Sequence, residues 1–173
     1  MLRRTWLGGL AAAVVLATTA VAAEKAAPNP GLDQLKKLAG TWVAADDKGQ
    51  PTAQVVSVFK VIAAGSAVEE SIFPGTGHEM VTVYHLDGKD VVLTHYCALG
   101  NQPRLKLDPA APKGKLAFKF VGGTNLDAAK DMHMHEGTIT VVDDDHIEWW
   151  WQAWQDGKPA DGHKIALKLV RKK

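Results

Sequence analysis

The chain has 173 residues, of which 46% are hydrophobic and 23% are charged, and its formal net charge at pH 7 is +1. A balance this close to neutral argues against a general nucleic-acid-binding protein, which would need a strongly basic surface. Cys97 is the only cysteine, so the chain forms no internal disulfide.

The first 23 residues have the pattern of a secretory signal peptide. Arg3 and Arg4 precede a short apolar stretch that runs into the small residues of ATTAVAA, and we expect cleavage after Ala23. Cleavage would leave 150 residues (173 less 23), with 18 basic side chains (20 less Arg3 and Arg4) and 19 acidic ones. We therefore expect one periplasmic or secreted domain with no stable membrane insertion after cleavage, because the apolar stretch is too short for a membrane span.

A leader and a short helix are expected next. Residues 24–31 contain Pro28 and Pro30, which predict a flexible leader. Leu32, Leu35 and Leu38 then recur at helical spacing, which predicts a helix over 32–38.

The rest of the chain predicts strands. Short segments rich in Val, Ile, Phe, Tyr, Trp and Thr are broken by Gly, Asp, Asn and Pro at intervals of about ten residues. We place the strands at 41–46, 53–62, 66–73, 78–86, 89–99, 101–107, 115–121, 134–142, 146–155 and 163–170. The predicted fold class is all-β, with one antiparallel sandwich or barrel domain over residues 32–173.

The first hairpin takes its register from Asp87-Gly88. This dipeptide suits a two-residue type I′ turn, which would pair Leu86 with Lys89. One face of the hairpin is the more polar, so we expect the other to point inward. The expected inward side chains are His78, Met80, Thr82, Tyr84, Val91, Leu93, His95 and Cys97.

The second hairpin turns at Asp143, Asp144 and Asp145. A three-residue loop there would place Ile139 opposite Trp149 and keep the apolar faces together. The same inner face would carry His133, His135, Gly137 and Trp151, whereas Trp150 and Trp154 would face outward and either pack under the predicted helix or mark a contact surface.

With the helix, the sequence LAGTW and about ten strands in place, the chain resembles the calycins, the superfamily of lipocalins and fatty-acid-binding proteins. Gly40 and Trp42 match the Gly-x-Trp element that opens the first strand of those barrels, where the tryptophan closes one end. The stretches MVTVYHLDG, LTHYCALGNQPR and FVGGTNLDAAKDMHMH look like a bacterial group of uncharacterised secreted lipocalin-like proteins. The resemblance implies a closed barrel with an internal cavity and no known reaction. The chain departs from lipocalins in having no disulfide, and from fatty-acid-binding proteins in having no two-helix lid.

The main functional expectation is an exported barrel that holds a small hydrophobic or amphipathic molecule. The expected apolar wall consists of Met80, Tyr84, Leu93, Trp149 and Trp151, and the expected polar end of His95, His135 and Arg104. Arg104, in GNQPR, would bind a carboxylate or phosphate if it points inward, or pair with a surface acid if it does not. The segment GGTNLDAAKDM would be either a lid hinged at Gly122 and Gly123 or an ordinary long connection.

The first alternative is a metal- or haem-binding barrel. His78, His95, Cys97, His133 and His135 offer imidazole and thiolate groups that suit zinc or copper, provided that at least three of them meet. Otherwise these histidines line the cavity or its rim. Haem-binding barrels of the nitrobindin type also resemble this plan, and His163 is the nearest positional candidate for their haem histidine.

The second alternative is an enzyme of unknown reaction. His95 and Cys97 share a strand face, but no third group that would activate the thiol is evident. The sequence contains no phosphate-binding glycine loop, serine-nucleophile motif or dinucleotide fingerprint. We therefore expect no catalytic residue.

Overall fold

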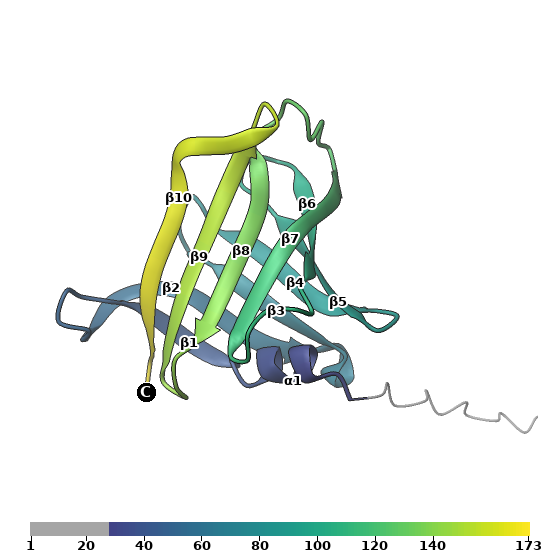
Figure 1. Cartoon of the computed structure of the whole chain (residues 1–173). Helices are drawn as coiled ribbons and strands as arrows, with labels where there is room; N and C mark the ends of the chain where they lie inside the picture. The colour runs from purple at the N-terminus through teal and green to yellow at the C-terminus, as the bar shows by residue number, and fades with distance from the viewer. Residues whose placement is uncertain (1–27) are drawn as a thin grey trace, which may run out of the picture.

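Ten antiparallel strands close into a barrel in the computed structural model, which describes residues 28–173 (Figure 1). Each strand pairs with the next along the chain, and β1 pairs with β10 to close the sheet. The strands are β1 (Gly40–Ala45), β2 (Pro51–Ile62), β3 (Ala67–Ile72), β4 (Met80–Asp87), β5 (Asp90–Tyr96), β6 (Gln102–Leu107), β7 (Lys115–Thr124), β8 (His133–Val141), β9 (His146–Gln155) and β10 (Lys158–Arg171). The predicted all-β barrel is confirmed, and the predicted signal peptide lies outside the described residues.

The α-helix α1 (Pro30–Lys36) packs across one end of the barrel (Figure 1). The Asn29 side chain accepts hydrogen bonds from the backbone N–H groups of Gly31 and Leu32, and Pro30 occupies the first helical position, where no N–H donor is needed. Leu32 and Leu35 are buried against the core. Residues 29–31, expected in a flexible leader, therefore belong to the helix and its cap. No helix within residues 28–173 is long and apolar enough to cross a membrane.

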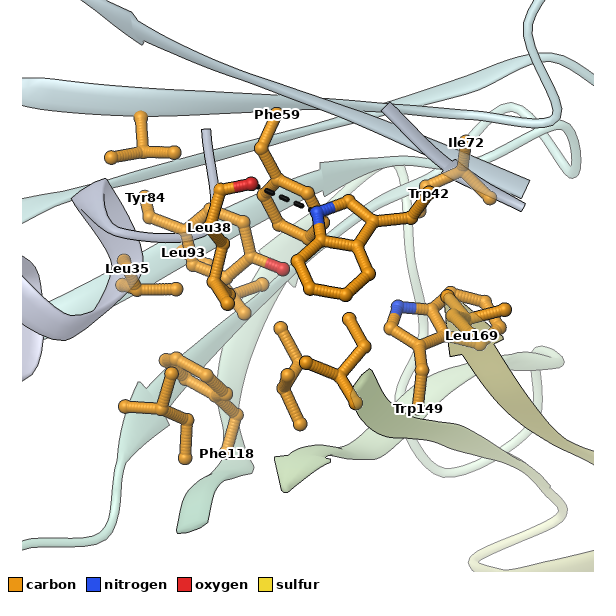
Figure 2. Close-up of a cluster of buried hydrophobic side chains, with 14 of the residues drawn as sticks. Leu35, Leu38, Trp42, Phe59, Ile72, Tyr84, Leu93, Phe118, Trp149 and Leu169 are labelled. Carbon is orange, nitrogen blue, oxygen red and sulfur yellow. Dashed lines mark hydrogen bonds between the residues drawn. The ribbon is translucent and has the colours of Figure 1, made fainter. Parts of the chain in front are cut away.

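Trp42 and Arg171 hold this closed end together. The buried Trp42 indole donates from Nε1 to the Leu38 carbonyl at 2.9 Å (Figure 2). The Arg171 guanidinium lies 4.4 Å from the Trp42 ring centroid and donates to the carbonyls of Lys37 and Ala39. These contacts make Arg171, near the C-terminus, part of the fold.

Most of the barrel interior near this end is filled. The buried core combines α1 and its following turn with inward residues of most strands (Figure 2). Its largest members are Trp42, Trp149, Tyr84, Phe59, Leu35, Ile72, Leu93, Leu105, Leu116, Ile139, Ile147 and Leu169.

The register of the second hairpin is confirmed and that of the first is wrong by two residues. Ile139 pairs with Trp149, as the three-residue loop predicts. In the first hairpin Asp87 pairs with Asp90, so the turn residues are Gly88 and Lys89, with a positive φ of 59° at Gly88. A glycine at the first central position suits a type II′ turn. A shift of two preserves the alternation of faces, so the expected inward face is still correct.

The last two strands are joined by a turn that the sequence analysis placed within a longer connection. Asp156 and Gly157 both have positive φ, 51° and 70°, as a type I′ turn requires. They pair Gln155 with Lys158, and β10 then bends where its register shifts between Pro159 and Lys164. β10 therefore begins at Lys158 rather than at the predicted residue 163.

Candidate functional site

The barrel carries a pocket at the end opposite α1. β5 runs from one end of the barrel to the other. It begins near α1, where the Asn29 side chain donates to the Lys89 carbonyl, and it ends at Tyr96, immediately before the pocket residue Cys97. The pocket has a volume of about 730 Å³. We call it the open-end pocket, and its lining is Phe73, Thr76, His78, Met80, Cys97, Ala98, Leu99, Met132, Met134, Ala153, Gly162, His163 and Ile165.

A β-bulge in β8 decides which side chains of the MHMH stretch enter this pocket. The pairing shifts by one residue between Met134 and Glu136, so that Met134 lies opposite Ala153 and His133 lies opposite Trp154. A one-residue shift reverses which face each side chain takes. Met134 therefore joins Ala153 in the pocket, whereas both histidines lie outside its lining. The expectation that His133 and His135 share the inner face with Trp151 is wrong for this reason.

His133 and His135 instead form a stacked cluster with two aromatic rings. The His135 ring lies 3.9 Å from the Trp154 ring, centroid to centroid and nearly parallel, and Phe120 lies within 4.8 Å of both histidine rings. Trp154 is thus covered by His135, and Trp150 by the Lys164 ammonium at 5.0 Å from its ring, rather than by the helix as one expectation had it.

The hydrogen bonds of the two histidines define their tautomers. His133 Nδ1 lies 2.8 Å from the Asp131 carbonyl oxygen, which only accepts, so Nδ1 carries a proton. Its Nε2 then accepts from His135 Nδ1 at 2.9 Å. Burial, together with the neighbouring His133, lowers the pKa of His135 to about 4. His135 is therefore neutral near pH 7, with its Nε2 left as an acceptor.

His95 and Trp151 lie together beneath the open-end pocket. Their rings are 5.4 Å apart, and both side chains are almost fully buried. His95 Nδ1 is 2.9 Å from the Thr82 hydroxyl, but His95 Nε2 and Trp151 Nε1 have no hydrogen-bond partner. Burial lowers the pKa of His95 to about 4, so the ring is neutral near pH 7.

Deeper in the barrel, Glu70 is the centre of a polar network that the sequence analysis did not single out. Its fully buried carboxyl group accepts from Ser57 Oγ at 2.6 Å, Tyr84 Oη at 2.6 Å and Trp149 Nε1 at 3.0 Å. Burial raises the pKa of Glu70 and the three donors oppose that shift, while burial and the nearby Glu70 raise the pKa of Tyr84. Alternation along β3 offered a signal, because Glu70 lies between Val68 and Ile72 on the inward face.

The eight residues predicted to bind the ligand are thus distributed over four places. Met80 lines the open-end pocket. Tyr84, Leu93, Trp149 and Trp151 belong to the buried core, and His95 lies among them. His135 is in the stacked cluster with Trp154. Arg104 is exposed and lies 3.7 Å from the Asp87 carboxylate, which is the surface ion pair weighed as its alternative.

The five candidate metal ligands do not converge. His78 and Cys97 line the open-end pocket, His95 lies beneath it, and His133 and His135 are in the stacked cluster with Phe120 and Trp154. Within residues 28–173, no group of three or more His, Cys, Asp or Glu side chains is arranged to hold a metal ion. Burial also raises the pKa of the Cys97 thiol, although the backbone N–H groups of Leu99 and Ala98 oppose this. The thiol is therefore not an activated nucleophile near neutral pH.

The segment from Gly122 to Met132 does not have the expected glycine hinge. Gly122 and Gly123 lie within β7 and pair with β6, opposite Arg104 and Pro103. The connection that follows is tied to the barrel rim, because Asn101 Nδ2 donates to the Met132 carbonyl at 2.8 Å and Asp156 donates from its backbone N–H to the Lys130 carbonyl.

Sequence reasoning missed most of the pocket lining. Phe73, Met132, Met134, Ala153 and Ile165 received no binding role, and His163 was considered only for haem. The alternation of Met and His in MHMH was a signal that one of the two residue types would face inward. It could not say which, because the bulge that decides this depends on pairing with β9.

No family model matches the chain, and no curated protein is significantly similar to it.

Proposed function

We propose that this protein is an exported, lipocalin-like binding protein that holds a small, mainly apolar molecule in the open-end pocket. The observation that carries the proposal is the lining itself, which includes Phe73, Leu99, Ile165 and three methionines. The signal-peptide pattern of residues 1–23 supports export.

The size and chemistry of the pocket both fit a small organic ligand. Its volume of about 730 Å³ lies within the range of small-molecule sites. Met80, Met132 and Met134 give it flexible, polarizable walls that can adapt to an apolar surface. The lining contains no Lys, Arg, Asp or Glu, and its polar side chains are limited to Thr76, His78, Cys97 and His163.

A pocket-filling variant tests the proposal. The uncharged fluorescent probe N-phenyl-1-naphthylamine should bind the mature protein with increased emission. Ala153→Phe adds a ring at the pocket wall and should weaken the binding at least tenfold, because the probe and the new ring compete for one volume. Ala128→Phe is the matched control, since Ala128 is exposed and outside the pocket lining.

The outcomes separate the proposal from unspecific binding. Loss of probe binding in Ala153→Phe alone supports the open-end pocket. Equal binding in both variants, or no binding to the wild-type protein, would refute it.

A further inference from the structure

Two buried nitrogen atoms without partners lie directly beneath the open-end pocket. His95 Nε2 and Trp151 Nε1 make no hydrogen bond, although His95 is 1% exposed and Trp151 is 2% exposed. A buried polar group without a partner is energetically unfavourable, so such groups are rare in native proteins unless a ligand or water satisfies them.

The strands place both residues one step below the pocket lining. Trp151 is two residues before Ala153 on the inward face of β9, and His95 is two residues before Cys97, which follows β5. Side chains two apart on a strand share a face and are separated by about 7 Å. Ala153 carries only a methyl group, so the wall above Trp151 is thin at this point.

The Trp151 ring is held in one position. It lies flat against Gly137, where an added Cβ would come within 2.8 Å of Cε3, and it packs edge-on to Trp149 with centroids 6.1 Å apart. The His95 ring is held in turn by the Thr82 hydroxyl. The two nitrogens therefore form a preorganised polar pair rather than mobile groups.

The chemistry of His95 Nε2 and Trp151 Nε1 favours an uncharged oxygen atom of a ligand as their partner. Trp151 Nε1 can only donate, so its partner must be an acceptor. His95 is neutral near pH 7, and the nearest buried acid, Glu70, is bound to Trp149, the neighbour of Trp151. A carboxylate placed here would be buried without a countercharge, since Arg104 is on the outer surface with Asp87.

We propose that the ligand of the open-end pocket inserts an uncharged oxygen-bearing head, such as a carbonyl or hydroxyl group, that accepts a hydrogen bond from Trp151 Nε1 and contacts His95 Nε2. This inference rests on the proposed function. It limits the ligand to apolar molecules with a neutral polar end and excludes fatty-acid anions.

Three naphthalene probes test the inference. 2-Acetylnaphthalene carries a ketone, 2-isopropenylnaphthalene replaces its C=O by C=CH₂ with the same shape, and 2-naphthoate carries an anion. Their affinities are measured at pH 7 by displacement of N-phenyl-1-naphthylamine. The decisive quantity is the ratio of ketone affinity to alkene affinity, because it cancels the contribution of the shared ring system.

We expect Trp151→Phe to lower this ratio about fivefold, the effect of losing one net hydrogen bond. Trp154→Phe is the matched control, because Trp154 Nε1 is also unpartnered but lies on the other face of β9 and should leave the ratio unchanged. 2-Naphthoate should bind the wild-type protein at least tenfold more weakly than the ketone.

A second measurement needs no variant. In protein labelled with ¹⁵N-tryptophan, the Trp151 indole N–H resonance is assigned by its contacts with Gly137. It should move downfield with the ketone and not with the alkene. This result is independent of whether Trp151→Phe folds.

The outcomes distinguish failure of this inference from failure of the proposed function. If the alkene binds but the ratio and the indole resonance do not respond, the two nitrogens hold water and the inference is overturned while the apolar pocket stands. If 2-naphthoate binds as tightly as the ketone, the exclusion of anions is overturned. If no probe binds, both the inference and the proposed function fail.

Discussion

Acidification should destabilise the fold through His95. Burial lowers the pKa of this histidine from 6.5 to about 4 in the folded protein. The unfolded chain therefore binds more protons than the folded protein between these values, so stability is lost as the pH falls below 6.5 and most of the loss has occurred by pH 4. For a single group with these two pKa values, the loss between pH 7 and pH 5 is about 2 kcal/mol.

Urea denaturation followed by tryptophan fluorescence at pH 7 and pH 5 measures this loss. His95→Gln keeps an amide that can bond to the Thr82 hydroxyl but does not titrate, so its free energy of unfolding should fall by about 2 kcal/mol less than that of the wild type over this pH interval. His78→Gln makes the same substitution at an exposed position and serves as the control. A wild-type loss no greater than that of His95→Gln would refute the argument that His95 is buried in its neutral form.

Two further predictions concern the fold. Gly137→Ala should lower the free energy of unfolding by about 1–3 kcal/mol, because the new methyl group would meet the Trp151 ring at 2.8 Å. Gly77→Ala is the control: a Cβ there has no atom within 4 Å, so the free energy of unfolding measured in the same urea titration should not change. Equal effects of the two substitutions would contradict this account. Arg171→Ala should lower the free energy of unfolding by about 2 kcal/mol, because the hydrogen bonds to the carbonyls of Ala39, Lys37 and Asp144 are lost. Lys172→Ala, at an exposed neighbouring position, should leave the free energy of unfolding unchanged. Thermal unfolding compares the two variants, and similar midpoint temperatures would show that Arg171 does not hold the closed end.

Local patterns were sufficient for the presence of the strands and for the faces of β9. Alternation in β9 predicted that Trp149 and Trp151 point inward and that Trp150 points away. The three aspartates of the preceding turn predicted the pairing of Ile139 with Trp149. These predictions succeed because the pleat of a strand is a local property and a hairpin register depends only on its own turn and faces.

The same reasoning failed where two arrangements satisfy the local pattern equally. Asp87-Gly88 and Asp156-Gly157 are the same dipeptide, yet only the second occupies the two central positions of its turn. Because a shift of two residues leaves every side chain on its face, the pattern around Asp87 could not distinguish the two registers.

By itself, the sequence determined an all-β chain with a short helix, about ten strands and an apolar face on the two hairpins that it could align. These features follow from residue periodicity and turn chemistry, which act over a few neighbouring residues. Only the tertiary structure decided that Met134 rather than His133 enters the pocket, that Arg104 lies outside, and that His95 and Trp151 are left without partners beneath the lining. The reason is that a bulge, an ion pair and an unsatisfied nitrogen are each defined by strands distant in the sequence, and those strands meet only when the barrel closes.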